Sequence, residues 1–270
     1  MMSVAHRFSR AAQTYERGAS LHRHVAARLM ETLPEPGRVG AGRILEVGCG
    51  TGVLTEQLRQ RYPEASLCVL DVADGMVAAV RERWGHDHRM EFVVADIREF
   101  SAPKPFDLIA SSSALHWVTP LDRTLVNMKR QLSEKGQCCA ALMIDGTLSE
   151  LHALRRRVAP GKIPATRLPT GEEVLLAAGS AGFTVVASEE ECIQTHYHSA
   201  DDFLRTLHAQ GLTGGTVSRA FAALSRTELK RLRREYDVAF RDERAGVYAS
   251  FVVFYIQLEG DGTFRPWLEH

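Results

Sequence analysis

A glycine-rich turn near the start of the chain constrains its fold more than any other feature. The turn, Glu46-Val47-Gly48-Cys49-Gly50-Thr51-Gly52, follows a short apolar run that begins at Arg43 and precedes a helical pattern over 54–62. Glycines at every second position let the backbone turn tightly and approach a ligand closely. The segment therefore predicts a strand–turn–helix unit with a ligand at the turn, although similar glycine spacing occurs in dinucleotide-binding folds.

Strand-like and helix-like segments alternate on both sides of this turn. A helix with leucines or valine at every fourth position is predicted over 4–33 and ends at Pro34. After the turn, strands are predicted at 67–70, 92–95, 106–110 and 137–144, helices at 76–84 and 121–132, and a turn at Lys135-Gly136. This alternation requires right-handed crossovers and predicts an α/β doubly wound, mostly parallel sheet.

The pattern changes after Asp145. Helical segments are predicted within 147–168, 172–181 and 200–244, a strand at 184–195, and a last strand, inserted into the sheet, at 247–258. Together with the N-terminal helices, the late helical insertions are predicted to form a lid over the carboxyl edge of the sheet.

Acidic residues at the ends of the predicted strands indicate which ligand the turn binds. Glu46 would repel a pyrophosphate but favours a cationic sulfonium group. Asp71 closes the second strand about 20 residues after the turn, where an acid binds ribose hydroxyls. Asp96 can accept a hydrogen bond from an adenine amino group, and Met76 and Ile97 can sandwich the ring. Each of these residues also has an alternative role without a ligand. Glu46 would then be a solvated charge at the end of a strand, Asp71 and Asp96 would cap a helix or a turn, and Met76 would pack in the core of a helix.

Residues 43–117 resemble the class I S-adenosylmethionine-dependent methyltransferases. The resemblance rests on Ile44-Leu45-Glu46-Val47-Gly48-Cys49-Gly50-Thr51-Gly52 and on Phe106-Asp107-Leu108-Ile109. It implies a Rossmann-like, seven-stranded sheet with S-adenosyl-L-methionine across the ends of the first two strands. The predicted cofactor contacts are Glu46, Gly48, Gly50, Gly52, Asp71, Met76, Asp96, Ile97 and Ser112.

Nearly the whole chain also resembles the malonyl-acyl carrier protein O-methyltransferases of biotin synthesis. The matching segments begin at Arg7, Ser111, Gly146, Leu168 and Leu207: Arg7-Phe8-Ser9-Arg10-Ala11-Ala12-Gln13-Thr14-Tyr15-Glu16, Ser111-Ser112-Ser113-Ala114-Leu115-His116-Trp117, Gly146-Thr147-Leu148-Ser149-Glu150-Leu151, Leu168-Pro169-Thr170-Gly171-Glu172-Glu173 and Leu207-His208-Ala209-Gln210-Gly211. The chain departs from the family's usual Tyr-Asp at Tyr15-Glu16, from its Ser-Asn at Ser111-Ser112 and from its Gln-Trp at His116-Trp117.

This resemblance implies methyl transfer to the free carboxylate of malonyl-acyl carrier protein or malonyl-coenzyme A. Such an acid titrates near about pH 4, so the acceptor is already ionised at pH 7 and needs no general base. Arg167 is predicted to bind the acceptor carboxylate, and Tyr15 to donate a hydroxyl or pack over the cofactor. His116 either packs beside Trp117 or serves as a base for a different acceptor.

Other functions fit parts of the same pattern. A methyltransferase for another small carboxylic acid, such as a tricarboxylate, would use the same cofactor. A non-catalytic S-adenosylmethionine-binding protein would also retain the glycine turn. A nicotinamide-dependent oxidoreductase is disfavoured by Glu46 and by a glycine spacing short of Gly-x-Gly-x-x-Gly.

The resemblance and the segment pattern together predict five parts. They are N-terminal helices over the active site at 1–40, a cofactor-binding core at 41–146, a lid insertion at 147–169, completion of the core sheet by 170–198 and 246–260, and a helical insertion at 199–245.

Composition limits the partners. Lys plus Arg equals Asp plus Glu, 33 each, which argues against a protein that coats nucleic acid or membrane. No apolar run approaches the roughly 20 residues that span a bilayer, which predicts a cytoplasmic protein. The five cysteines lack a Cys-x-x-Cys pair and are predicted to be buried free thiols, with no metal site.

A predicted amphipathic helix at 226–240 is the candidate contact for the carrier protein. Its apolar face carries Leu229, Leu232, Tyr236 and Phe240, and another face carries Arg226, Lys230, Arg233 and Arg234. This basic stripe fits an acidic carrier protein, and it fits equally a solvated helix face. The run Arg155-Arg156-Arg157 is a second candidate.

Overall fold

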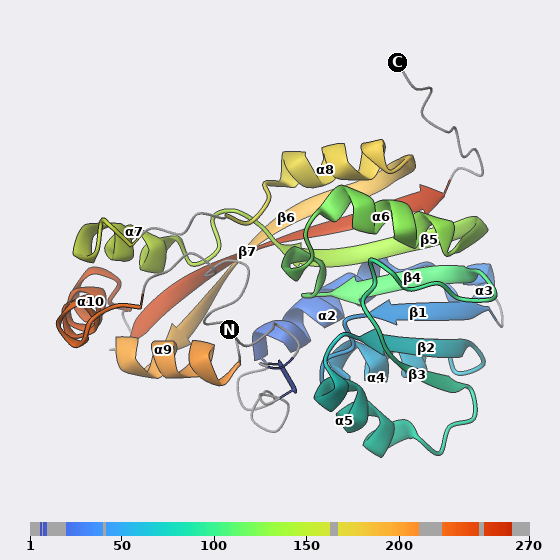
Figure 1. Ribbon diagram of the computed structural model, residues 1–270, viewed down its shortest axis with the longest axis horizontal. Coiled ribbons are helices and arrows are strands. Elements are labelled where there is room, and N and C mark those ends of the chain that lie inside the picture. Colours follow the sequence, from blue (N-terminus) through green and yellow to red (C-terminus); the bar gives the residue numbers. More distant parts are fainter. Residues whose placement is uncertain are drawn as a thin grey trace.

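A single seven-stranded sheet organises the computed structural model, which describes residues 6, 8–9, 20–39, 42–162, 167–210, 223–242 and 246–260 (Figure 1). The strand order is β3-β2-β1-β4-β5-β7-β6. In chain order the strands are β1 (Arg43–Val47), β2 (Ser66–Asp71), β3 (Met90–Val94), β4 (Phe106–Ser112), β5 (Leu132–Met143), β6 (Phe183–Tyr197) and β7 (Val247–Gly260).

The first five strands run parallel, and β7 enters between β5 and β6 antiparallel to both. The predicted sheet of seven mostly parallel strands, with its last strand inserted, is therefore confirmed. Because the chain reverses its direction of travel across the sheet after β3, the carboxyl ends of β1 and β4 form a topological switch point, where ligands bind in such folds.

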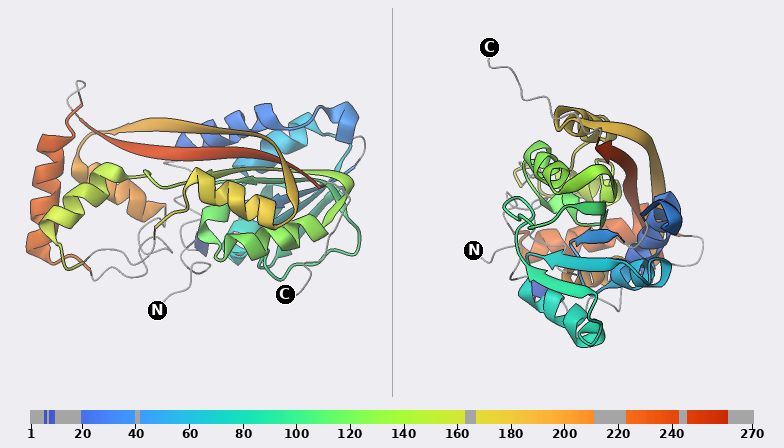
Figure 2. Two further views of the ribbon diagram at one scale, coloured as in Figure 1. Left: turned by 90° about the horizontal axis from the view of Figure 1, so that it is seen from above. Right: turned by 90° about the vertical axis from the view of Figure 1, so that its right-hand side faces the viewer.

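Helices cover both faces of the sheet because successive strand residues point to opposite sides. Ile44 of β1 packs into the cluster that contains α2 (Ser20–Thr32), α4 (Val53–Arg61) and α5 (Asp74–Trp84). The next residue, Leu45, packs into the cluster beneath α6 (Leu121–Arg130) and α8 (Gly171–Ser180). Short helices α3 (Pro36–Val39) and η2 (Leu115–Trp117) follow α2 and β4 in the chain, and Figure 2 shows the layered arrangement end-on.

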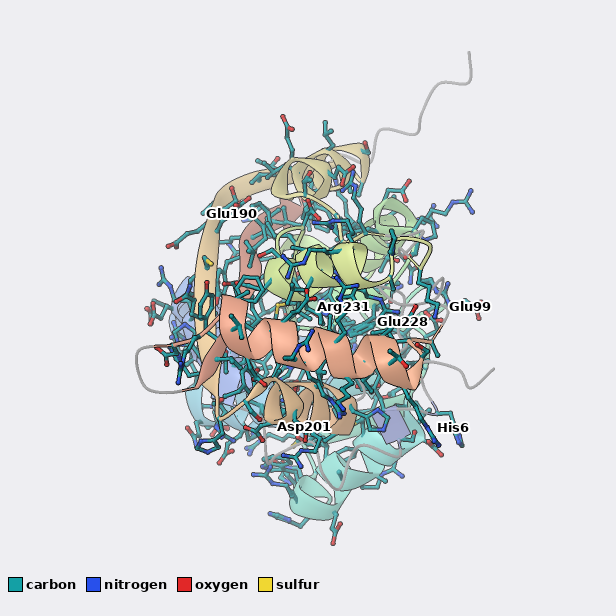
Figure 3. The ribbon with its side chains drawn as sticks, turned by 90° about the vertical axis from the view of Figure 1, so that its left-hand side faces the viewer. His6, Glu99, Glu190, Asp201, Glu228 and Arg231 are labelled. Carbon is teal, nitrogen blue, oxygen red and sulfur yellow. The ribbon has the colours of Figure 1, made fainter. Side chains whose placement is uncertain are left out.

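Strands β6 and β7 extend beyond the core and carry a helical lobe. The lobe contains α7 (Ser149–Val158), α9 (Ala200–Ala209) and α10 (Arg226–Ala239), with α10 packed on both of the others. A chain of ring contacts joins Tyr197, Phe203, Tyr236, Phe240 and Tyr248. Figure 3 looks onto this end, where α10 crosses the molecule and carries Glu228 and Arg231.

Several predicted bounds were wrong. Strand β5 begins at Leu132, so Lys135-Gly136 lies inside it, at an irregularity where the pairing with β4 shifts register. The helix predicted within 147–168 is α7, whereas the stretch 200–244 contains the separate helices α9 and α10, each begun by a capping serine.

The cysteines follow the prediction except at one position. Cys49, Cys68, Cys138 and Cys139 are buried free thiols, but Cys192 is exposed because β6 is the edge strand of the sheet. Within the described ranges, no helix is both long and apolar enough to cross a membrane, and no group of three His, Cys, Asp or Glu residues could hold a metal.

Candidate active site

A cavity of about 340 Å³ lies over the switch point of the sheet. The segments that follow β1, β2, β3 and β4 all contribute to its lining, and Phe8 adds the N-terminal segment. Of the predicted cofactor contacts, eight line this one cavity: Glu46, Gly48, Gly50, Asp71, Met76, Asp96, Ile97 and Ser112.

The glycine turn has the geometry that its sequence predicts. Gly48 has a φ of 76°, and a Cβ there would lie 2.2 Å from the Cβ of Ala114, so a side chain is excluded. Gly52 also has a positive φ, 93°, but a Cβ there would meet Trp84, and Gly52 is not among the residues that line the cavity. Gly52 therefore allows α4 to pack closely on α5, which differs from the ligand contact predicted for it.

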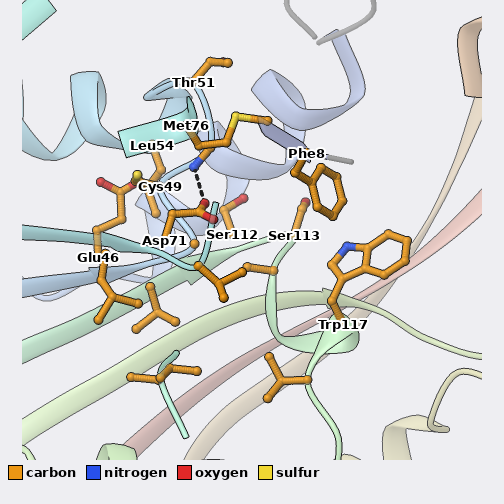
Figure 4. A pocket seen from close by; sticks show the side chains of 18 of the residues that line it. Phe8, Glu46, Cys49, Thr51, Leu54, Asp71, Met76, Ser112, Ser113 and Trp117 are labelled. Atoms are coloured by element: carbon orange, nitrogen blue, oxygen red, sulfur yellow. Dashed lines mark hydrogen bonds between the residues drawn. The ribbon is translucent and has the colours of Figure 1, made fainter. Parts of the chain in front are cut away.

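Asp71 ties the glycine turn to the start of α5. Its Oδ2 accepts a hydrogen bond from the Gly50 amide at 3.0 Å, drawn in Figure 4, and its Oδ1 accepts from the Ala73 amide at 2.9 Å. Burial raises the pKa of this carboxyl above its usual value, while the two amides act in the opposite direction. An ionised carboxylate has about four acceptor positions, so Asp71 retains capacity for ligand hydroxyls.

Glu46 is a buried acid at the floor of the cavity, only 1% exposed. Its Oε2 accepts from the Thr55 hydroxyl at 2.7 Å, whereas its Oε1 has no hydrogen-bond partner among the described residues. Burial raises the pKa of Glu46 to about 8, and the nearby Asp71 carboxylate adds to this rise. The site thus holds an acid that a cationic ligand would ionise and stabilise.

Buried polar atoms without partners gather around the same cavity. Besides Glu46 Oε1, they include the hydroxyl oxygens of Thr51, Ser112 and Ser113. A buried polar group without a hydrogen bond costs about 1–3 kcal/mol, so several such groups around one cavity indicate a polar ligand that satisfies them.

The end of the cavity near β3 suits a flat ring. Met76 and Ile97 are buried apolar side chains in the lining, and Asp96 lies beside them. Both Asp96 oxygens accept hydrogen bonds from the Arg98 side chain, which lowers the pKa of Asp96. Asp96 is therefore an ionised acceptor at the edge of an apolar slot, as the adenine prediction requires.

The N-terminal segment closes part of the cavity, through residues that sequence reasoning did not select. The Phe8 ring contacts Trp117 edge to face, with centroids 5.4 Å apart, and both residues line the cavity. The Ser9 hydroxyl donates to Asp74 at 2.6 Å, at the start of α5. Phe8 and Ser9 belong to the matched N-terminal segment, but no local signal marks their contacts, Trp117 for Phe8 and, 65 residues further along the chain, Asp74 for Ser9.

Arg167, predicted to bind the acceptor carboxylate, does not line the cavity. Its guanidinium donates to both oxygens of Glu173 at 2.8 and 2.6 Å. Glu173 also accepts from the Thr170 amide in the capping box that begins α8, so the arginine is held at a helix start. Tyr15 lies outside the described residues.

His116 packs beside Trp117, with ring centroids 5.1 Å apart, and its Nδ1 accepts from the Met143 amide at 3.3 Å. Burial lowers the pKa of His116 to about 3, so the ring is neutral at physiological pH. It is not part of the cavity lining, which supports the packing role over that of a base.

The sequence has clear relatives among known proteins. Residues 44–136 match the family described as a methyltransferase domain. The malonyl-[acyl-carrier protein] O-methyltransferase of Anoxybacillus flavithermus is 31% identical over 91% of this chain and 94% of that protein. The protein of the same name from Geobacter sulfurreducens is 31% identical over 93% and 96%. A solved S-adenosylmethionine-dependent methyltransferase from Mesorhizobium loti, 21% identical, superposes with a TM-score of 0.53 over 86% of this chain and 96% of that one.

The sheet topology, the glycine turn and these similarities define an S-adenosylmethionine-dependent methyltransferase with the class I fold. Its cofactor is S-adenosyl-L-methionine, and the unpaired Glu46 Oε1 and hydroxyls among the described cavity residues fit that cationic, polar ligand. Within this class, the chain belongs to the malonyl-[acyl-carrier protein] O-methyltransferase family.

Proposed function

We propose that this methyltransferase converts the free carboxylate of malonyl-acyl carrier protein to its methyl ester in biotin (pimeloyl) synthesis. The observation that carries the proposal is the similarity to relatives of that name, which extends over more than nine-tenths of this chain and of each relative. Esterification removes the charge at the end of the malonyl group, so that chain-extending enzymes can treat it as an apolar acyl group.

Different residues of the cavity bind different parts of the cofactor. Asp71 holds the ribose hydroxyls, Glu46 faces the cationic amino acid part, and Gly48 and Gly50 let the backbone approach it. Met76 and Ile97 enclose the adenine, and Asp96 accepts a hydrogen bond from its amino group. When bound, S-adenosylmethionine supplies a methyl group activated by a sulfonium.

The acceptor requires positioning and exclusion of water, and no proton has to be removed. A malonyl carboxylate is ionised at pH 7 because such acids titrate near about pH 4. Phe8 and Trp117 form an apolar wall that keeps water from the reacting groups. The neutral, buried His116 has no proton to take in this reaction.

We infer that the acidic carrier protein docks on the exposed face of α10. Arg226, Lys230 and Arg234 are exposed at four-residue intervals on this helix. Arg233, predicted as part of the same stripe, instead pairs with Asp201 of α9 at 3.0 Å. The alternative run is less available, since Arg157 pairs with Glu235.

The docking proposal is tested by the double variant Lys230→Glu/Arg234→Glu. Exposed charges act mainly on the association rate and are screened by salt over about 10 Å at 0.1 M. We expect a loss of kcat/KM with malonyl-acyl carrier protein, and none with malonyl-coenzyme A. Arg123→Glu/Arg130→Glu makes the same charge change at exposed positions of α6 and is the matched control. An equal loss with both substrates, or with the control, rules out this docking face.

The substrate proposal is tested by comparing acceptors with labelled S-adenosylmethionine. We expect label transfer to malonyl-acyl carrier protein and malonyl-coenzyme A, and much less to free malonate or a tricarboxylate. Preferential methylation of a free acid would assign the chain another small-acid acceptor. Cofactor binding without transfer to any of them would make it a binding protein.

A further inference from the structure

Two adjacent serines at the end of β4 carry hydroxyls that have no partner among the residues the structure describes. Ser112 is the last residue of β4 and Ser113 follows it; both line the cavity. Neither hydroxyl oxygen has a hydrogen-bond partner among the described residues, although both are buried. In Figure 4 the two hydroxyls point the same way, toward the side of the cavity where Phe8 lies.

The backbone of Ser113 brings these hydroxyls together. Consecutive side chains of a strand point to opposite faces, so two neighbouring serines in regular β4 would diverge. Ser113 instead has a φ of 56°, a left-handed conformation that side-chain-bearing residues rarely adopt. Its amide donates to the Ala141 carbonyl at 2.8 Å and fixes this geometry. Such strain, held in place by a neighbouring strand, is characteristic of ligand sites.

The position of the serines assigns them to the acceptor end of the cavity. Glu46 lies on β1 and the glycine turn follows it, Asp71 ends β2, and Asp96 follows β3, so the proposed cofactor contacts extend from β1 towards β3. The serines lie across the switch point on β4, next to the wall formed by Phe8 and Trp117. An acceptor that approaches from this side meets the hydroxyls first.

The cavity offers its acceptor little positive charge. Among the described lining residues, Arg98 is the only lysine or arginine, and its guanidinium is paired with Asp96 near β3. The candidate clamp Arg167 is exposed and paired with Glu173. Within the described part of the chain, a carboxylate bound beside β4 therefore meets neutral hydrogen-bond donors.

We propose that the Ser112 and Ser113 hydroxyls donate hydrogen bonds to the carboxylate of the short acyl thioester acceptor. This inference rests on the proposed function. The two donors hold one carboxylate oxygen and leave the charge of the other available for attack on the methyl group. Neutral donors suit this task because a guanidinium fork would engage both oxygens and lower their nucleophilicity.

The test is Ser113→Gly, which removes the hydroxyl and favours the left-handed backbone. We expect the KM for malonyl-acyl carrier protein and for malonyl-coenzyme A to rise at least tenfold. The dissociation constant of S-adenosylmethionine, measured by calorimetry, should remain within twofold, and the melting temperature should not fall. Ser113→Asn keeps a donor and tolerates the same φ, so it should recover a large part of the loss.

Ser111→Ala is the matched control, because the Ser111 hydroxyl already donates to the Val47 carbonyl at 2.9 Å. It should lower the melting temperature and leave both acceptor KM values unchanged. A weaker cofactor affinity with unchanged acceptor KM in Ser113→Gly would overturn the inference, since the hydroxyls would then serve the cofactor's own carboxylate. Unchanged values of both would overturn it as well. If the unaltered protein methylates neither malonyl-acyl carrier protein nor malonyl-coenzyme A, the proposed function is wrong. This outcome is distinguishable from a failure of the inference about the serines, which appears only in the variants.

Discussion

Replacing Glu46 with glutamine separates what this residue does for the cofactor from what it does to the fold. Glutamine has nearly the same shape and its carbonyl can still accept from Thr55, which now donates to Glu46 at 2.7 Å. The substitution removes only the ionisable group, whose pKa burial raises from 4.5 to about 8.

The raised pKa makes Glu46 destabilising at high pH in the cofactor-free protein. The folded state holds the proton more tightly than the unfolded state, so this contribution to stability is present below about pH 4.5 and is lost as pH rises through about 8. The loss is on the order of 4 kcal/mol for a shift of this size. The melting temperature of the unaltered protein is compared with that of Glu46→Gln at each pH. For a domain of this length, we expect this difference to be about 10 °C more unfavourable to the unaltered protein at pH 9 than at pH 5.

The same ionisation controls cofactor binding. A cationic ligand requires the ionised Glu46, which is the minor form below pH 8, so binding releases a proton. The affinity of the unaltered protein should rise about tenfold per pH unit between pH 5.5 and 7.5. This window lies below the titration of an amino group such as the cofactor's own, near about pH 8. Glu46→Gln should bind at least tenfold more weakly at pH 7.5 and show no such slope.

Calorimetry at several pH values and thermal unfolding of the cofactor-free protein measure both effects. A flat affinity in the unaltered protein over this window would refute the assignment of Glu46 to the cationic part of the ligand. Parallel melting profiles of protein and variant would refute the buried, protonated state.

Three further substitutions test other parts of the site. Asp71→Ala should weaken S-adenosylmethionine binding by roughly 1.5–3 kcal/mol because it removes charge-assisted hydrogen bonds, and an unchanged dissociation constant in calorimetry would remove Asp71 from the site. His116→Ala should retain turnover with saturating cofactor. The pH–rate profile of the unaltered protein should lack a limb near pH 6.5, because the pKa of His116 is about 3. Complete loss of turnover in His116→Ala with intact cofactor binding would instead indicate that His116 acts as a general base. Arg167→Lys should keep the acceptor KM within twofold, since Arg167 does not line the cavity and its guanidinium is paired with Glu173. A tenfold rise in that KM would return Arg167 to the acceptor site.

The fold and the cofactor end of the cavity could be predicted from the sequence because their signals are local. The alternation of strands and helices specifies the parallel core, and an acid at the end of β2 must lie beside the turn after β1 when those strands pair. The inserted strand β7 was visible as a long apolar run. Its insertion into the sheet was predicted, but its partners, β5 and β6, were not.

The acceptor end could not be predicted because its geometry depends on contacts distant in sequence. Nothing local marks Ser113 for a left-handed backbone, which is fixed by the carbonyl of Ala141 on β5. Phe8 and Trp117 are far apart in sequence and come into contact only when the chain folds. Arg167 is instructive, since the pattern Thr170 to Glu173 is a capping box, and an acid so placed attracts a nearby arginine.

The most direct test of the account is the chemical identity of the product formed from malonyl-acyl carrier protein. The protein and labelled S-adenosylmethionine are incubated with the carrier substrate, and the label is then followed through mild base treatment and mass analysis of the acyl group. We expect one methyl group per malonyl group, bound as a base-labile ester on the terminal carboxylate. A base-stable methyl group on the malonyl carbon or on the carrier protein, or no label on either, would contradict it.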